Sequence, residues 1–277
     1  MKNIDGFLFY SRQEREFIMK KLLSLLAVMM MAMCLFACSS KDTTDDDTVT
    51  ISVGLSPDYA PYESLDTNGN LVGFDIDMLN SMEKLLSEAN GKTYKFEIYQ
   101  MSFDNIITQI QGGQLNCGVS GFTWSEEREK AITFSTPYAG AKEVVMVLAD
   151  SGYSTLADLQ DKKLAAQTGS TDEKLAQETF GKENVSSIQS VNDMIPGLDA
   201  HQYDAVVLDE AVATSYASTG KYVVLDEALE NEYSYIVVGK GDNKTLAIIN
   251  QAIELFIASD GYKSLCEQYQ ISPIEVK

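Results

Sequence analysis

Strand-like and helix-like segments alternate along the chain, and this alternation restricts the possible folds more than any other feature. Residues 49–55 alternate apolar and polar side chains, as a strand with one buried face does. Residues 73–91 place their large apolar side chains on one helical face, and Gly91 provides a helix stop. Repeated strand–helix–strand units predict an α/β fold with mixed, mostly parallel sheets covered by helices.

The same pattern continues to the end of the chain. Further strands are expected at 94–101, 115–121, 162–167, 185–191, 203–209 and 233–240, and further helices at 103–113, 170–180, 210–218, 245–261 and 262–270. Ser102 is expected to cap the first of these helices, and Pro196 is expected to break a helical stretch.

The two blocks of alternating segments predict two lobes. Lobe 1 is expected to comprise residues 49–139 and 236–277, and lobe 2 residues 140–235. The chain would cross between the lobes near 138–142 and 233–238, and these two hinge strands would join them. A cleft between two such lobes is a natural site for a small ligand.

Charge and histidine content exclude several classes of function. The formal net charge is −20, which argues against nucleic acid as a partner. His201 is the one histidine of the sequence, which argues against a histidine-rich metal site or a Ser-His-Asp triad. We therefore expect no metal, no cofactor and no catalytic residue.

The N-terminal region has the pattern of a secretory signal. Lys20 and Lys21 precede an apolar run, 22–36, and small residues surround Cys38. The apolar run is short for a bilayer span, which needs about 20 residues. We interpret 1–37 as a signal peptide whose natural start is Met19.

Leu35, Ala37 and Cys38 resemble a bacterial lipobox. The resemblance implies cleavage before Cys38 and lipidation of that cysteine, which would anchor the protein to a bacterial membrane from the outside. An ordinary signal peptide with a chance cysteine is the alternative. Residues 38–48 are polar and acidic and predict a flexible tether.

Two cysteines, Cys117 and Cys266, lie in the folded part of the sequence. An exported protein could pair them in a disulfide. Two separate buried thiols are the interpretation that we favour.

Arg128 is unusual in both its number and its place. Arginine otherwise occurs only at positions 12 and 15, within the leader. Arg128 follows two possible helix caps, Thr123 and Ser125, and a cation in a first helical turn opposes the helix dipole. An anion bound at this helix start would explain it, since a guanidinium binds a carboxylate with two parallel hydrogen bonds. A surface ion pair with a neighbouring glutamate is the alternative.

A free amino acid carries an anionic carboxylate and a cationic ammonium group on one carbon. Lobe 2 offers further groups that could bind such a ligand. Ser170 and Glu173 fit a capping box, and Gly169 would let the backbone approach a ligand closely. Asp209 ends an apolar strand, at the sheet edge where α/β proteins bind ligands, and is the natural partner for an ammonium group. Each feature could also be a plain helix cap.

Four stretches, at 53–82, 102–138, 165–175 and 203–213, closely resemble the polar amino-acid solute-binding proteins of ABC importers. The resemblance covers the chain from about residue 49 to its end. It implies a two-lobed type II periplasmic-binding-protein fold that closes around one amino acid and acts as a monomer beside an ABC permease.

The resemblance also implies roles for individual residues. Arg128 resembles the carboxylate-binding arginine, and Asp209 resembles the ammonium acceptor. The hydroxyl and N–H donors beside the arginine would be Ser120, Thr123, Ser170 and Thr171. The walls around the ligand side chain would be Tyr59, Tyr62, Phe103 and Phe122, although ordinary core packing is the alternative for each.

The sequence departs from the family at several of these positions. Gly121 replaces a second serine and Ser56 an acid that binders of basic amino acids tend to carry, so lysine and arginine are disfavoured as ligands. Asn116 and Cys117 stand where the family usually has Asp and Ala. Trp124 is expected to pack at the helix start rather than line the pocket.

The predicted function is capture of a free, polar amino acid and its delivery to an ABC permease. A dehydratase of prephenate-like acids on the same fold is one alternative, for which Asp172, Glu173 or Asp209 could supply an acid. A module that presents its ligand to a membrane receptor is another.

Overall fold

The computed structural model describes residues 48–274. The predicted signal peptide, the lipidation site at Cys38 and nearly all of the tether lie outside the described residues. None of the helices within 48–274 has both the length and the apolar character needed to cross a membrane.

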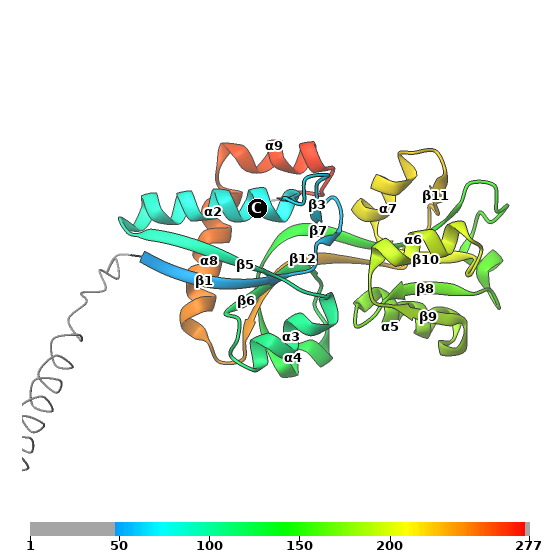
Figure 1. Ribbon diagram of the computed structural model, residues 1–277, viewed down its shortest axis with the longest axis horizontal. Helices are drawn as coiled ribbons and strands as arrows, with labels where there is room; N and C mark the ends of the chain where they lie inside the picture. Colours follow the sequence, from blue (N-terminus) through cyan, green and yellow to red (C-terminus); the bar gives the residue numbers. More distant parts are fainter. Residues whose placement is uncertain (1–47, 275–277) are drawn as a thin grey trace, which may run out of the picture. The chain divides into compact units, whose positions relative to one another are not determined.

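One nine-stranded sheet runs through the described chain (Figure 1). Its strand order is β5-β1-β6-β12-β7-β10-β8-β9, and β11 pairs with β7. The strands are β1 Thr48–Leu55, β5 Thr93–Gln100, β6 Cys117–Phe122, β7 Ile132–Leu148, β8 Leu164–Gln167, β9 Val185–Ile188, β10 Ala205–Asp209, β11 Tyr222–Val224 and β12 Glu230–Gly239. β1 pairs in parallel with β5 and β6, and β8 pairs in parallel with β9 and β10. β7 and β12 are antiparallel to their neighbours, so the sheet is mixed as predicted.

Helices cover both faces of this sheet. They are α2 Phe74–Asn90, α3 Phe103–Gln111, α4 Glu126–Ala131, α5 Thr171–Phe180, α6 Val191–Asp199, α7 Glu210–Ala217, α8 Asn243–Ile257 and α9 Asp260–Tyr269, with short 3₁₀ turns η1 Leu156–Leu159 and η2 Lys182–Asn184. In Figure 1, α2 and α9 lie on one side of β1, β5 and β6, whereas α3 and α4 lie on the other. The α/β class predicted from the alternation is therefore confirmed.

The long strands β7 and β12 link two groups of elements. Their residues 132–137 and 235–239 pair with one another beside β6, and residues 143–147 of β7 pair with β10. We call β1 to α4, with α8 and α9, lobe 1, and η1 to β11 lobe 2. The predicted crossings near 138–142 and 233–238 lie within β7 and β12.

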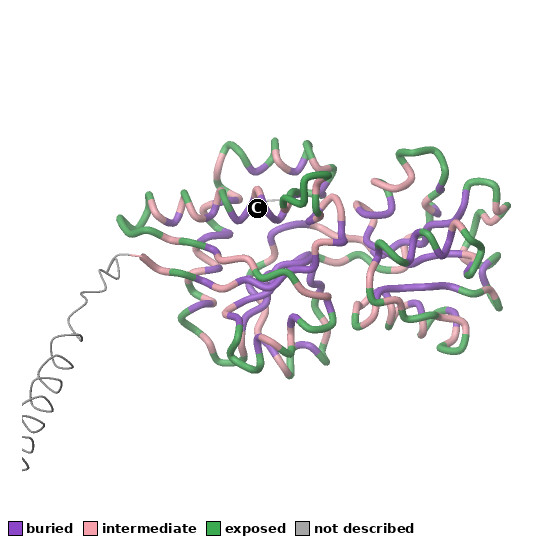
Figure 2. Tube along the Cα trace, viewed as in Figure 1, coloured by how far each residue is buried: buried purple, intermediate pink, exposed green. Residues whose placement is uncertain are grey.

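The core follows the apolar faces that the sequence indicates. Leu79, Met82 and Leu86 of α2 are fully buried, whereas Leu85 on the same helix is only half-buried. The helix ends at Gly91 with a left-handed φ of 64°, as predicted. Figure 2 shows that burial is continuous along the central strands and sparse on the connecting loops. The sheet therefore forms a rigid support for the loops at its strand ends.

Two expectations about local structure were wrong. Pro196 lies inside the continuous helix α6. The backbone carbonyl of Asn192 loses its helical partner there, but Asn192 and Pro196 are both exposed, so water can solvate it. Ser102 occupies the N-cap position of α3, but its hydroxyl accepts from the side chain of Asn105 at 2.7 Å and bonds no helix N–H.

Two features were left open or were not predicted. Cys117 and Cys266 are separate buried free thiols, which excludes the disulfide alternative. A small three-stranded sheet, β2 Asp58–Tyr59, β3 Glu63–Leu65 and β4 Leu71–Val72, follows β1. Its strands are too short to show an alternating pattern.

Candidate functional site

Arg128 is buried between the two lobes. Ser125 caps α4 by accepting from the backbone N–H of Arg128 at 3.2 Å, which places the side chain in the first helical turn, as predicted. The guanidinium donates to the backbone carbonyl of Thr123 at 2.9 Å and to that of Gly169, in lobe 2, at 3.0 Å. Only 8% of the residue is exposed, which excludes a surface ion pair as its role.

A stacked pair of aromatic rings lies beside this guanidinium. Phe103 and Phe122 stack with centroids 4.7 Å apart, and the Arg128 Cζ atom lies 5.4 Å from each centroid. Cation–π attraction favours the charged form in this partly desolvated place. A guanidinium has five N–H donors, and the contacts with Thr123 and Gly169 leave some of them for a ligand.

The start of α5 forms the opposite wall. Ser170 caps the helix by accepting from the backbone N–H of Glu173 at 2.9 Å. Glu173 does not complete the predicted capping box, because its carboxylate accepts from the N–H of Gly169 at 2.7 Å instead of from that of the cap residue. Gly169 has a φ of +80°, and this turn directs its carbonyl to Arg128.

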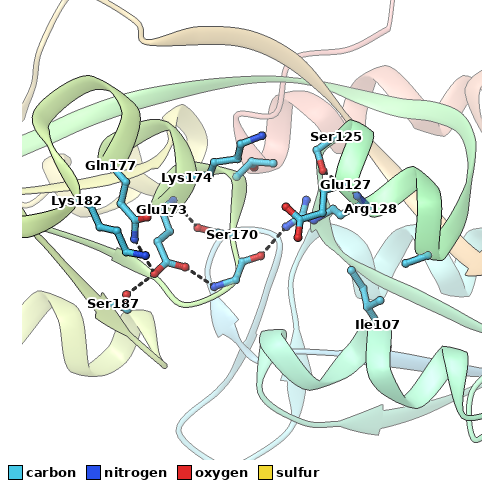
Figure 3. Close-up of a pocket in the computed structure, with 13 residues that line it drawn as sticks. Ile107, Ser125, Glu127, Arg128, Ser170, Glu173, Lys174, Gln177, Lys182 and Ser187 are labelled. Carbon is cyan, nitrogen blue, oxygen red and sulfur yellow. Dashed lines mark hydrogen bonds between the residues drawn. The ribbon is translucent and has the colours of Figure 1, made fainter.

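Figure 3 shows this meeting of the lobes. Arg128 extends from one side and bonds the Gly169 carbonyl, while Glu173 braces the turn through Gly169, Gln177 and Ser187. The space beside them is an outer cavity of about 560 Å³ that opens to solvent.

Asp209 lies across the cleft from Arg128. Asp209 ends β10 and occupies the N-cap position of α7. Its side chain forms no hydrogen bond to the N–H groups of that helix, so the carboxylate is not used as a helix cap. The residue is 3% exposed, and its backbone N–H donates to the Tyr59 hydroxyl at 3.2 Å. Gly121 has a φ of +55°, which favours glycine, and a Cβ there would lie 3.3 Å from the Tyr59 ring and 3.4 Å from the Asp209 carboxylate.

Burial dominates the electrostatics at Asp209. Desolvation, followed by the charge of Glu143, raises the pKa of Asp209 to about 8. Asp172, the second residue of α5, is 5% exposed, and desolvation, followed by the charge of Asp209, raises its pKa well above the usual range. One Asp172 oxygen has no hydrogen-bond partner among the described residues. Burial also opposes the charge of Arg128, because desolvation lowers its pKa, and the charge of Asp172 acts in the opposite direction.

Most of the predicted site residues line one small inner cavity of about 10 Å³. Its lining is Tyr59, Phe103, Ser120, Gly121, Arg128, Gln167, Ser170, Thr171, Asp172 and Asp209. Groups from both lobes thus surround the same point. The cavity is too small for an amino acid, so the lobes must separate for one to enter.

Three predicted residues lie just outside this lining. Thr123 holds Arg128 through its carbonyl and bonds the Thr171 hydroxyl across the cleft. Phe122 packs behind Arg128, fully buried. Tyr62 stacks behind Tyr59, with centroids 5.8 Å apart. These positions are those of supports rather than of walls.

Sequence reasoning missed several residues of this region. Gln167 lines the inner cavity, as does Asp172, which the sequence suggested only as an acid of the alternative dehydratase. Asp58 joins the lobes by accepting from Gln167 at 3.1 Å and from the backbone N–H of Val191 at 3.0 Å. Glu143 could have been noticed in the sequence, because it is an acid that directly precedes an apolar run of β7. Trp124 is 47% exposed, so the expectation that it packs at the helix start was wrong.

The arrangement fits binding of a zwitterion. A buried guanidinium faces two buried carboxylates, with hydroxyls between them, and nothing in this set acts as an activated nucleophile. Among residues 48–274, no three acidic, cysteine or histidine side chains are grouped to ligate a metal ion.

The comparison with protein families decides the kind of protein. Residues 51–272 match the model of the bacterial extracellular solute-binding proteins, family 3. The chain belongs to this family. Members of this family bind solutes and are not enzymes, so the dehydratase alternative is excluded.

Relatives named as amino-acid-binding proteins match most of the length of this solute-binding protein. A probable histidine-binding protein of Neisseria gonorrhoeae is 29% identical over 78% of this chain and 81% of its own. The arginine-binding extracellular protein ArtP of Bacillus subtilis is 27% identical over 85% of this chain and 92% of its own.

Solved structures give the fold. The substrate-binding protein of an amino acid ABC transporter matches with a TM-score of 0.71 and 30% identity, over 80% of this chain and 99% of that one. The arginine-, lysine-, histidine-binding protein ArtJ of Geobacillus stearothermophilus matches with a TM-score of 0.73 and 27% identity, over 80% and 95%. This solute-binding protein therefore has the type II periplasmic-binding-protein fold that the sequence predicted.

Proposed function

We propose that this solute-binding protein captures one free amino acid between its lobes and delivers it to an ABC permease. The observation that carries this proposal is the convergence of Arg128 and Asp209, from opposite lobes, on one buried cavity. An amino acid carries an anion and a cation on the same carbon, and these two residues offer the matching charges. Relatives whose names specify histidine, arginine or an amino acid ABC transporter support the same ligand class.

Each end of the ligand has its own set of partners in this proposal. Arg128 binds the α-carboxylate, assisted by hydroxyl and N–H donors, and Asp209 accepts from the α-ammonium. The assisting donors are Ser120, Ser170 and Thr171, with Thr123 beside them, and the aromatic walls are Tyr59 and Phe103, supported from behind by Tyr62 and Phe122. Gly121 lies next to Tyr59 and Asp209.

Closure of the lobes completes the site. We assign residues 49–139 and 236–277 to one rigid lobe and 140–235 to the other, with bending in β7 and β12. The ligand binds first to Arg128 on lobe 1, and closure then adds Asp209 and the turn at 169–172. Because the ligand contacts both lobes only when they are closed, binding shifts the equilibrium toward the closed form, which the permease would recognise.

We further propose that lipid on Cys38 anchors the protein outside a bacterial membrane. The lipobox at 35–38 and the polar tether after it support this location. Metabolic labelling with a radioactive fatty acid should label the wild-type protein and the control Cys34→Ala, but not Cys38→Ala. Label on Cys38→Ala would contradict the anchor.

A thermal-shift screen of the mature protein against the twenty amino acids and cystine tests the binding function. A ligand that binds the folded protein at 100 times its Kd should add about 2.7 kcal/mol to the free energy of unfolding. One amino acid, or a few related ones, should raise the Tm in proportion to the logarithm of concentration. No shift with any of them, and no heat in calorimetry, would reject amino-acid capture.

A further inference from the structure

Acidic side chains of neighbouring strands lie side by side at the hinge. Glu143 of β7 lies directly opposite Asp209 of β10 on one side and opposite Glu230 of β12 on the other. Glu232 follows two residues after Glu230, so it shares the same face of the sheet. Like charges directly opposite one another destabilise a sheet. We call Glu143, Glu230 and Glu232 the hinge acids.

Among the described residues, the most buried carboxylate oxygens of the hinge acids have no hydrogen-bond partner. Glu143 is 1% exposed, and within residues 48–274 neither of its carboxylate oxygens has a hydrogen-bond partner. One oxygen of Glu232 is also buried without a partner among those residues. Desolvation, followed by the charge of Asp172, raises the pKa of Glu143 to about 9. A buried carboxylate without a partner is costly, which points to a missing cation.

Nearby cations of the chain are bonded elsewhere. Lys142 is on the opposite face of β7 and pairs with Glu210 at 3.0 Å. Lys174 is half-exposed at the rim and lies 3.9 Å from Glu178. Arg128 attracts Glu143 and Glu232 electrostatically, but its hydrogen bonds go to the carbonyls of Thr123 and Gly169. The face of the hinge acids therefore carries more negative charge than these residues neutralise.

A cavity of about 170 Å³ opens beside these acids. Glu143, Glu230 and Glu232 line it together with Thr171, which also lines the inner cavity. Trp124 lines it too and is 47% exposed, so its ring is available to a cation. Thr171 thus lines both the inner cavity and this second cavity, which we call the hinge cavity.

We propose that the hinge cavity is the subsite for the positively charged side chain of the bound amino acid, with Glu143 and Glu232 as its acceptors and Trp124 covering it. This inference rests on the proposed function and adds the ligand class, a basic amino acid. Glu143 is the cross-strand neighbour of Asp209, so a long side chain that starts near Asp209 can reach it.

The proposal reverses an expectation drawn from the sequence. Ser56 stands where binders of basic amino acids tend to carry an acid, and it bonds Asp58 at 2.7 Å, which is itself bonded to lobe 2. The hinge acids would supply the missing carboxylate from a different part of the fold. Basic ligands are then favoured rather than disfavoured.

Calorimetric titration of wild type and Glu143→Gln tests the subsite. The probes are arginine, lysine, ornithine and histidine, with citrulline, norleucine and glutamine as neutral counterparts. Wild type should bind at least one basic probe more tightly than every neutral one. Loss of a charge-assisted hydrogen bond should lower that affinity by about tenfold or more in Glu143→Gln, with little change for neutral probes. Glu232→Gln should show a smaller loss of the same kind.

Glu254→Gln is the matched control, because it removes an exposed acid of α8 that lines neither the inner cavity nor the hinge cavity. Its affinities should equal those of wild type. The amide at 143 has nearly the same shape as the buried carboxylic acid and carries no charge, so circular dichroism and Tm should show a folded protein. Equal binding of basic and neutral probes by wild type, or an unchanged preference in folded Glu143→Gln, would overturn the subsite. Failure of every amino acid to bind would instead reject the proposed function.

Discussion

The cationic end and the acidic end of the candidate site differ in the contacts that the protein itself provides to their charged groups. Arg128 has carbonyl partners from both lobes and lies beside the stacked rings of Phe103 and Phe122. Asp172 and Asp209 are equally buried, yet their pKa values are raised, because burial and mutual repulsion oppose their charged forms. The cationic end is already organised for a carboxylate, whereas the acidic end is unfavourable until a cation arrives.

Removal of Arg128 should have the largest effect on binding. Arg128→Ala should weaken binding of the cognate amino acid by about 1.5–3 kcal/mol, because a charged hydrogen-bonding partner is lost. Calorimetry on the variant measures this loss. Lys130→Ala, in the exposed part of the same helix, is the control and should bind like wild type. Unchanged affinity in Arg128→Ala would remove the cationic end from the site.

Asp209→Asn should separate affinity from stability. The variant should bind the amino acid about 1–3 kcal/mol more weakly, since the ammonium loses a charged acceptor. The ligand-free variant should be at least as stable as wild type, because the amide carries no buried charge. Calorimetry and urea unfolding measure the two quantities. A ligand-free variant less stable than wild type would show that the protein, not the ligand, satisfies this carboxylate.

The free energy of unfolding of the ligand-free protein should depend on pH through the buried acids of the site. The pKa is about 8 for Asp209 and about 9 for Glu143, in a region that also contains Asp172, Glu232 and Arg128. Both values lie above those of the unfolded chain, about 4, so the folded protein binds the extra protons. Their stabilising contribution is complete below pH 4 and is lost as the pH rises to 8–9.

Thermal unfolding of ligand-free wild type and Asp209→Asn between pH 5 and 9 checks this sign. The stability of the variant relative to wild type should increase with pH across that range. A difference that stays constant, or that decreases toward pH 9, would contradict the raised pKa of Asp209.

The smallest expected effect concerns the turn that faces Arg128. Ser170→Ala removes the N-cap of α5 and should lower the free energy of unfolding by about 1 kcal/mol. Binding should weaken less than in Arg128→Ala, because the Gly169 carbonyl is also braced by Glu173. Urea unfolding and calorimetry of the same variant give both values. A loss of affinity equal to that of Arg128→Ala would mean that the Ser170 hydroxyl itself binds the ligand strongly.

Local sequence rules predicted the features that depend on neighbouring residues. The alternation of segments gave the α/β class, Gly91 marked a helix end, and Ser170 marked a helix start. Arg128 and Asp209 attracted attention because each breaks or ends a local pattern, and both line the inner cavity.

Features that depend on long-range register were not predictable in the same way. Glu143 neighbours Asp209 and Glu230 only because three strands far apart in sequence align in one row. Asp172 looks like an ordinary first-turn acid until the lobes meet. Whether Trp124 packs or stays exposed is likewise decided by neighbours that no local pattern reveals.

The most direct test of the central claim compares an amino acid with its decarboxylated amine. Calorimetry of wild type and Arg128→Ala would use the tightest-binding amino acid and the amine derived from it, for example arginine and agmatine. Wild type should prefer the amino acid by about tenfold or more, and Arg128→Ala should lose that preference, because Arg128 is the partner of the carboxylate. The same preference in both proteins would show that the carboxylate binds elsewhere and would contradict the account.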